Sequence, residues 1–472
     1  MLDTGEVIDG FTLGALMHRG GMASLYSVTH PDWPRLPMLM KIPKLQSGED
    51  PAAIVSFEME LMILPRLQGR HVPRFITSRG FEAQPYIVME RIEGSSLLPL
   101  LENLPLPIEE VVAIALRSAI ALDDLHQQDV VHLDIKPSNI LRRPNGDVVL
   151  ADFGLAHHQK LPDLMQEEFR LPYGTAPYMA PEQVMGVRGD PRSDLFALGV
   201  LMYFFVTGTR PFGDPQSLKG LKRRLWRDAT PPIVLRPDCP EWLQEIILRC
   251  LEVEPARRYQ SAAQLAFDLT HQDQVALTSR ASKRQRDGWA TVLRRRFNPE
   301  ARPDFRLPSA ARRQQSQAPI ILVAVDLQEA EAGLSANLLQ AVQRILPSLP
   351  GARLACLHVQ KTRLISIDED TDQAGHNRHA EAIAALKLWA APLGLPEDTV
   401  TYHVLEAVSV AGSILEYAAH NHVDHILLAA RSPSARRRWL GSVSAEVAEK
   451  AQCSVTVVRP RRAATVQEGD RI

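Results

Sequence analysis

The sequence predicts two domains of different fold class, an α+β domain followed by a doubly wound, five-stranded parallel α/β domain. Its 472 residues are enough for two or three domains. From residue 1 to about 272, the pattern begins rich in strands and continues as long helices. After residue 318, five short apolar strands alternate with amphipathic helices, which predicts a parallel sheet covered on both faces.

Composition places the chain among ordinary globular proteins. Hydrophobic residues make up 45% and charged residues 23%, which excludes disorder and fibrous structure for most of the chain. The longest apolar run, "LFALGVLMYFFV" at 195–206, is too short to span a bilayer and predicts a buried helix. The N-terminus carries no secretory signal. The four cysteines lie far apart without a CxxC pair, so we expect a cytoplasmic protein without zinc or disulfides.

Two short stretches of the first domain carry reactive side chains. "HLDIKPSN" supplies Asp134, Lys136 and Asn139, and "ADFGLA" supplies Asp152. Phosphoryl transfer to a hydroxyl needs metal ligands, a cation on the phosphates, a carboxylate facing the hydroxyl and a flexible backbone lid. With "MLMKIPK" upstream and "GTAPYMAPE" downstream, these motifs resemble the eukaryotic-type Ser/Thr protein kinase family, especially its bacterial branch, over residues 11–270.

The resemblance implies a bilobal kinase fold, ATP with Mg²⁺ (or Mn²⁺) as cofactors, and a protein Ser/Thr substrate. It assigns Asp134 as catalytic base and Lys136 as the cation on the transferring phosphoryl group. Asn139 and Asp152 would hold the metal through hard oxygen ligands. A glutamate, here Glu60 on a predicted amphipathic helix, would pair with the phosphate-binding lysine.

Two lysines compete for that phosphate-binding role. Lys41 lies 19 residues before Glu60, the spacing usual in the family. Lys44 follows Pro43, which would interrupt the hydrogen bonds of a central strand. We therefore assign Lys41.

The predicted phosphate lid, "HRGGMASLY", departs from the family pattern. Gly20 and Gly21 remain, and glycines there allow positive φ and close approach of N–H groups to phosphate. His18 and Ala23 replace the outer glycines, and Leu25 replaces a valine. We expect His18 to be an exposed loop residue, with stiffening of the lid or a bond to phosphate as alternatives.

The predicted adenine pocket also departs from the pattern. Leu39 stands where the family has a small alanine, so its larger side chain would crowd the adenine. Met89 resembles the gatekeeper residue, and Glu90 to Ile92 resemble the hinge whose backbone bonds the adenine edge. These contacts require no particular side chain at Glu90 or Ile92.

The residue before the catalytic aspartate in many kinases is an arginine that binds a phosphate on the activation segment. This chain has Leu133 there. Between residues 155 and 180, Thr175 is the one Ser or Thr, and it matches the family's substrate-facing threonine. We therefore predict a kinase of the non-RD type, whose activity does not depend on phosphorylation of this segment.

Three further residues match structural positions of the family. Asp194 in "RSDLFALG" corresponds to a buried aspartate that ties down the catalytic loop. Glu182 of "APE" corresponds to the partner of an arginine, here Arg258 in "PARRY". We expect all three to support the scaffold rather than the chemistry.

The second domain carries moderately specific motifs. "ILVAVD", "LLAARS" and "LGSVSAEVAEKAQCSVTVV" resemble the universal stress protein family over residues 318–459. Members that bind ATP use an aspartate after the first strand, here Asp326, and a glycine-rich loop. Here Ala430 and Pro433 replace the leading glycines and the loop before Gly441 is shortened, which disfavours ATP binding. A generic flavodoxin-like domain is the alternative.

Two features of this domain suggest partners. Arg436 to Arg438 could hold another anion or a protein. The edge strand 454–458 could pair with its copy in a second chain, giving a homodimer.

The boundaries predicted are a kinase domain at 1–272, an Arg-rich linker at 273–317, a stress-protein-like domain at 318–460 and a tail at 461–472. Residues 279–313 carry 11 Lys and Arg against three Asp and Glu. We interpret this stretch as a flexible, solvated tether. Contact with an acidic partner, nucleic acid or anionic lipid is the alternative, and nucleic acid is not favoured.

The sequence thus favours a cytoplasmic Ser/Thr protein kinase, without a membrane span, that is regulated or docked through the stress-protein-like domain. One alternative is a pseudokinase acting as a nucleotide-responsive or protein-binding scaffold. Another makes the C-terminal domain the main nucleotide sensor.

Overall fold

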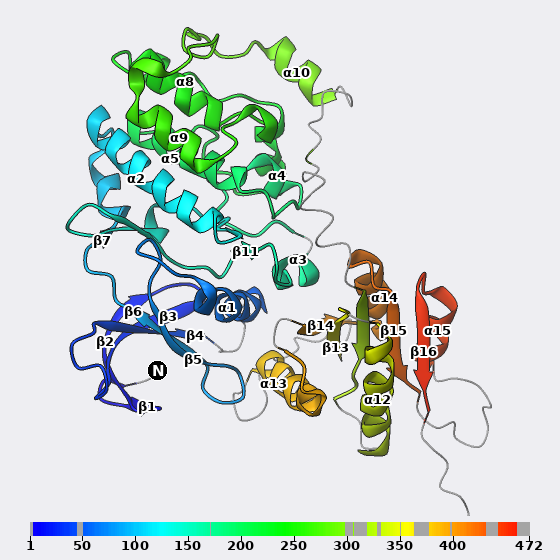
Figure 1. The fold of residues 1–472 in the computed structure, drawn as a ribbon. Helices are drawn as coiled ribbons and strands as arrows, with labels where there is room; N and C mark the ends of the chain where they lie inside the picture. The colour runs from blue at the N-terminus through cyan, green and yellow to red at the C-terminus, as the bar shows by residue number, and fades with distance from the viewer. Residues whose placement is uncertain are drawn as a thin grey trace, which may run out of the picture. The chain divides into compact units, whose positions relative to one another are not determined.

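The computed structural model of the chain describes residues 3–44, 51–169, 171–297, 305, 319–327, 332–349, 351–362, 377–396, 399–430 and 442–459, with the side chains of 51, 332 and 442 left out. The described residues up to 305 form one compact unit, and those from 319 on form a second. Figure 1 shows both units.

The first unit begins with a six-stranded antiparallel sheet in the order β1-β2-β3-β4-β6-β5. Its strands are β1 (Val7–Ile8), β2 (Phe11–Arg19), β3 (Ala23–Thr29), β4 (Met38–Pro43), β5 (Phe75–Arg79) and β6 (Tyr86–Glu90). Helix α1 (Pro51–Ile63) lies between β4 and β5 in the chain. Alternation along β4 buries Met38, Met40 and Ile42 in the core of this lobe. Leu39 and Lys41 therefore share the opposite face.

Helix α1 differs from the predicted amphipathic helix. All residues from 52 to 60 are buried, so the helix has no exposed face over this stretch. Most of the run "PAAIVSFEMELMI" is apolar, and its polar members Ser56, Glu58 and Glu60 are buried as well, so no polar face is turned to solvent.

The second lobe is helical (Figure 1). Its principal helices are α2 (Ile108–His126), α5 (Arg192–Thr207), α8 (Glu241–Cys250) and α9 (Ala262–Thr270). The run 195–206 lies in α5 and is buried except at Phe204, as predicted. No helix in the described ranges is long and apolar enough to cross a bilayer. The predicted α+β class with two lobes is confirmed.

Short elements surround the site between the lobes. They are β7 (Ser95–Ser96), β8 (Val130–Val131), β9 (Ile140–Arg142), β10 (Val148–Leu150), β11 (His157–His158), α3 (Leu164–Glu168) and α4 (Pro181–Val184). Strands β8 and β11 pair, as do β9 with β10 and with β7. These pairs fix the loop 132–139 and the segment that follows Asp152.

The first part of the predicted linker is not a solvated tether. Glu245 on α8 is 2% exposed and accepts hydrogen bonds from Thr278, Ala281 and the Arg280 guanidinium at 2.9–3.1 Å. Helix α10 (Trp289–Phe297) follows, and Arg295 on it pairs with Asp228 at 2.9 Å. The basic residues thus meet acidic residues of the helical lobe. We call residues 278–297 the docked segment; the linker beyond it lies largely outside the described residues.

The second unit is a parallel five-stranded sheet in the order β14-β13-β12-β15-β16. Its strands are β12 (Ile320–Ala324), β13 (Arg353–Lys361), β14 (Val400–Ala407), β15 (His425–Ala429) and β16 (Ser454–Val458). The crossover helices are α12 (Ala332–Ile345), α13 (Arg378–Ala390), α14 (Val410–His420) and α15 (Ser442–Lys450). All predicted strands and helices of this domain are present, and β16 is an edge strand.

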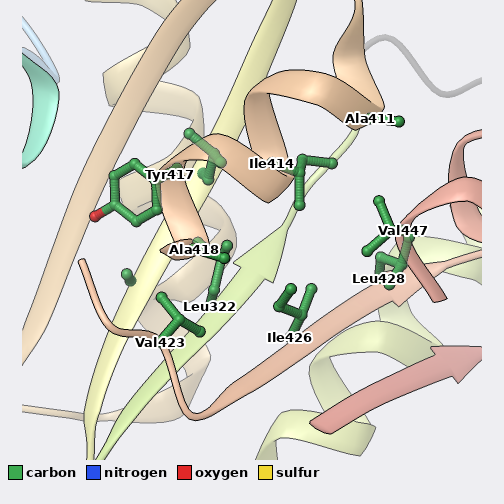
Figure 2. Packing of buried hydrophobic residues seen from close by; sticks show 11 residues of the cluster. Leu322, Ala411, Ile414, Tyr417, Ala418, Val423, Ile426, Leu428 and Val447 are labelled. Carbon is green, nitrogen blue, oxygen red and sulfur yellow. The ribbon is translucent and has the colours of Figure 1, made fainter. Parts of the chain in front are cut away.

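The core of this unit explains its helix placement. Figure 2 shows Ile414 and Tyr417 of α14 and Val447 of α15 packed with Leu322 and Leu428 of the sheet. On α13, the Trp389 indole donates to Ser335 of α12 at 2.8 Å. Helices cover both faces, so the doubly wound class is confirmed.

Candidate active site

Lys41 lies at the centre of a charge cluster between buried Glu60 and exposed Asp152. Its ammonium donates to Glu60 Oε2 at 2.5 Å and to Asp152 Oδ1 at 2.8 Å. Glu60 comes from α1 and is 1% exposed. Lys44 lies outside β4, which ends at Pro43. The structure therefore brings Lys41, and not Lys44, together with the predicted glutamate and metal ligand.

The charges of this cluster stabilise one another. Attraction to Lys41 lowers the pKa of Asp152 to about 2. Burial alone would lower the pKa of Lys41, but Asp152 and Glu60 more than reverse this and raise it. The cluster therefore keeps a cation and a carboxylate in their charged forms at neutral pH, as phosphate and metal binding require.

Asp134 is bonded through both carboxylate oxygens. Its Oδ1 accepts from the Thr175 hydroxyl at 2.8 Å and from the Thr175 N–H at 3.1 Å. Its Oδ2 lies 2.6 Å from Lys136 Nζ and accepts from the Asn139 amide at 3.0 Å. Lys136 also donates to the Thr175 hydroxyl at 3.1 Å. A hydroxyl thus already contacts both the carboxylate and the ammonium.

The backbone of this loop is held by Asp194. This residue is fully buried on α5 and accepts from the N–H groups of His132 and Leu133, each at 2.8 Å. Leu133 has φ +63°, which is unusual for a bulky residue. Its side chain is 4% exposed, and its carbonyl accepts from Gln183 at 2.9 Å. The predicted scaffold aspartate therefore fixes a strained turn directly before Asp134.

The two predicted metal ligands, Asn139 and Asp152, come from neighbouring segments. The Ala151 N–H donates to the Asn139 carbonyl at 2.9 Å, which places Asp152 beside the loop that carries Asn139. Asp152 has φ +68°, and the adjoining Phe153 ring packs 5.2 Å from the His132 ring. A carboxylate and an amide oxygen suit Mg²⁺, which binds few protein ligands and keeps its waters.

The predicted lid is a short turn between β2 and β3. The Gly20 N–H donates to the Ala23 carbonyl at 3.0 Å. Neither Gly20 nor Gly21 has a positive φ, so the expected left-handed backbone is not used here. A Cβ on Gly20 would lie 3.6 Å from the His18 ring, while one on Gly21 would meet nothing. His18 belongs to β2 and pairs with Leu25, so it is not a loop residue.

The hinge follows β6. Met89 is 8% exposed and pairs with Leu39 of β4. Glu90 is held by Arg143 at 2.8 Å. Among the described residues, no protein group accepts from the N–H of Ile92. That donor is free for a ligand's acceptor, while Leu39 shares the Lys41 face of β4, where it would narrow the space for a base.

Comparison with known proteins agrees with this arrangement. The family model of the protein kinase domain matches residues 11–269. The chain belongs to the protein kinase family. A serine/threonine-protein kinase PknL of Mycobacterium tuberculosis is 33% identical to this kinase over 234 residues, which cover 49% of this chain and 58% of that protein.

Two further relatives match the same kinase domain. A probable serine/threonine-protein kinase of Clostridium perfringens is 30% identical over 53% of this chain and 36% of its own. A probable serine/threonine-protein kinase PknB of Lactococcus lactis is 26% identical over 57% and 43%. The kinase domain is thus what is shared, and the match spans between about a third and three fifths of these relatives.

The second unit has its own family match. The model of the universal stress protein family matches residues 319–459, as the resemblance predicted. Asp326 follows β12 at the end of the sheet where doubly wound domains bind ligands. The loop with Pro433, Arg436 to Arg438 and Gly441 lies outside the described residues, so its predicted role stays a prediction.

One predicted support and one missed cluster complete the kinase domain. Arg258 and Glu182 form a two-pronged ion pair at 2.6 and 2.7 Å, with both side chains at most 1% exposed. Sequence reasoning did not find Asp163, which is bonded to His157 and Arg188. The signal available was Asp163 directly before a short helical pattern, where aspartate is a preferred N-cap.

Proposed function

We propose that this chain is a Ser/Thr protein kinase that transfers the γ-phosphoryl group of ATP to hydroxyls of a protein. The observation that carries the proposal is the link from Glu60 through Lys41 to Asp152. In a kinase this alignment of lysine, glutamate and metal-binding aspartate must be in place for transfer. The relatives named as Ser/Thr kinases support the same reaction class.

The residues of the site then have separate tasks. Asp134 accepts the hydrogen bond of the incoming hydroxyl, as it does from the Thr175 hydroxyl at 2.8 Å. Lys136, 2.6 Å from the same carboxylate, neutralises the transferring group. Lys41 binds the α- and β-phosphates of the nucleotide. Mg²⁺, held by Asn139 and Asp152, would neutralise charge on the β- and γ-phosphate oxygens.

The nucleotide lies between the lid and the hinge in this proposal. Gly20, Gly21 and Leu25 cover the phosphates, while Met89 and the backbone of Glu90 and Ile92 border the base. In the part of the chain that the structure describes, no protein group accepts from the Ile92 N–H, which supports this placement.

The remaining proposals concern organisation and control. The kinase domain covers residues 1–272, the stress-protein-like domain covers 318–460, and the docked segment extends the kinase unit to residue 297. With Leu133 before Asp134, we assign the chain to the non-RD type. Control then comes from the C-terminal domain or from a homodimer formed through β16, in the cytoplasm.

A test of the proposal measures transfer of label from γ-labelled ATP to a protein substrate. Asp134→Ala and Asp152→Ala should abolish incorporation, because each removes a group that contacts the reactants. Asp238→Asn, a substitution at a side chain 70% exposed, is the control and should leave incorporation intact. Equal incorporation in all proteins would refute the assignment.

A scaffold without catalysis is the second candidate. The position of Leu39 on the face of β4 that carries Lys41 favours it, because a bulky side chain there opposes adenine binding. Thermal unfolding with and without Mg-ATP separates the kinase from a scaffold that binds no nucleotide. A bound nucleotide stabilises the fold and raises Tm, whereas Tm stays unchanged if Mg-ATP does not bind.

A further inference from the structure

The activation segment, residues 152–182, contains a buried carboxylate that none of the catalytic steps uses. Asp163 is 7% exposed. Its Oδ1 accepts from the Gln166 N–H at 3.2 Å and so caps α3. Its Oδ2 accepts from Arg188 Nε at 2.7 Å and lies 3.0 Å from His157 Nδ1. Both oxygens of one side chain are therefore used to join separate parts of the chain.

Besides Gln166 of α3, the partners of Asp163 come from two other parts of the chain. His157 lies on β11, which pairs with β8 directly before the catalytic loop. Arg188 follows α4, and it also donates to the Leu155 carbonyl at 2.8 Å. Arg188 thus holds the beginning of the activation segment at two points, from a position beyond the end of that segment.

The charge of Asp163 suits this task. Burial would raise the pKa of the Asp163 carboxyl, but Arg188 and His157 lower it well below its usual range. The carboxylate is thus present at any physiological pH. Such charge-assisted hydrogen bonds are the strong ones in proteins.

The other end of the segment is held by a second arginine. Arg224 is 1% exposed and donates to the carbonyls of Ala176, at 2.7 Å, and Met179. Among the described residues it has no carboxylate partner, and burial lowers its pKa to about 10. Ala176 directly follows Thr175, so Arg224 fixes the backbone beside the hydroxyl that contacts Asp134.

We propose that Asp163, clamped by Arg188 and His157, orders the activation segment of this kinase in place of a phosphate. In kinases with an arginine before the catalytic aspartate, a phosphate supplies the negative charge and that arginine receives it. Here the Asp163 carboxylate supplies the negative charge. Arg188 binds it, since position 133 holds a leucine in place of the usual arginine. Asp163 and Arg188 are positioning residues, and the inference rests on the proposed kinase activity.

The clamp, which is Asp163 with Arg188 and His157, lies in a segment that is linked both to α1 and to the catalytic loop. Helix α3, which Asp163 caps, contacts α1, the helix that carries Glu60. A Cβ on Gly154 would lie 2.1 Å from Ser56 Oγ of α1, so the start of the segment also packs tightly on this helix. On the other side, Gln183 of α4 holds the carbonyl of Leu133. Loss of the clamp should therefore affect substrate binding and catalysis more than ATP binding.

The test compares the full-length wild type with Asp163→Asn and with Asp163→Asn/Arg188→Gln. Each protein is treated with phosphatase, and then kcat and KM for a serine peptide, KM for ATP, Tm and hydrogen exchange of residues 157–169 are measured. The single variant should lose about tenfold or more in kcat/KM for the peptide, change KM for ATP less than about threefold, and exchange faster in 157–169. The double variant should regain Tm, because no buried charge is left unpaired, but should not regain kcat/KM.

Glu245→Gln provides the matched control. Glu245 is an equally buried carboxylate with an arginine partner, but its bonds lie in the docked segment. The Glu245→Gln substitution should lower Tm and leave kcat/KM for the peptide within about threefold of the wild type.

The outcomes separate the two proposals. A wild type that binds Mg-ATP but phosphorylates nothing would refute the kinase assignment, and hydrogen exchange would then judge the clamp alone. Unchanged exchange in Asp163→Asn would overturn the clamp. So would phosphatase treatment that abolishes wild-type activity, or a double variant whose kcat/KM recovers together with its Tm.

Discussion

Removal of one hydroxyl should slow the reaction without unfolding the protein. Thr175→Val keeps the shape of the side chain but loses the donor to Asp134 Oδ1 at 2.8 Å and the acceptor for Lys136 at 3.1 Å. The Thr175 N–H still reaches the same carboxylate at 3.1 Å, so its charge stays partly bonded.

The expected magnitude comes from the strength of hydrogen bonds to charged groups. One such bond contributes about 1.5–3 kcal/mol, which corresponds to a loss of roughly 10- to 150-fold in kcat/KM. Thr175→Ser keeps the hydroxyl and should remain within about threefold of the wild type. Because Thr175 is half-buried, we expect little change in Tm.

The assay is the initial rate of label transfer from γ-labelled ATP to a serine peptide, with KM for ATP measured in parallel. Thr270→Val is the control, because its hydroxyl bonds only the Ala266 carbonyl of its own helix. The reasoning is refuted if Thr175→Val stays within threefold of the wild type, or if Thr175→Ser is as slow as the valine variant.

Three other perturbations have defined outcomes. Glu182→Gln leaves the Arg258 cation buried without its partner, which should cost about 3–5 kcal/mol and lower the Tm of the kinase domain by about 6–20 °C in calorimetry. His379 is 6% exposed, its ring nitrogens lack partners in the described part of the chain, and burial lowers its pKa to about 4. Protonation of His379 therefore favours unfolding, so its contribution to stability is fully present above pH 6.5 and declines toward pH 4. The free energy of unfolding of the stress-protein domain should fall by about 2 kcal/mol between pH 7.5 and 5.0. His379→Leu should remove this loss. Leu39→Ala should tighten Mg-ATP binding about fivefold or more in calorimetric titration, since relief of crowding is worth about 1 kcal/mol, whereas unchanged affinity would show that Leu39 does not border the base.

Much of the site could be predicted from the sequence because its chemistry is local. Asp134, Lys136 and Asn139 lie within six positions, so one loop brings them together. Lys41 and Glu60 could be paired because the family that the motifs resemble places such a glutamate at this spacing, and the structure joins them at 2.5 Å. In the second domain, alternation of strands and helices predicted every element of the sheet.

The contacts that the sequence did not predict join residues that are distant in the chain. Arg188 lies 25 residues from Asp163 and beyond another helix, so no periodicity or motif joins them. The sequence predicts a solvated stretch after residue 272 because its acidic partners, Asp228 and Glu245, lie far from it in the chain, in a loop and in α8. The glycines of the lid would allow positive φ, but neither Gly20 nor Gly21 uses it, and the Gly20 N–H donates to the Ala23 carbonyl.

The docked segment has a practical consequence for anyone who dissects this protein. The kinase family model ends at residue 269, but Glu245 obtains its bonds from residues 278–281 and Asp228 pairs with Arg295. A fragment cut at the family boundary would retain every proposed catalytic group and still leave the Glu245 and Asp228 carboxylates without these partners. The unit recognised by homology and the unit that folds therefore end at different residues, and a truncated enzyme could be judged inactive for a reason unrelated to its chemistry.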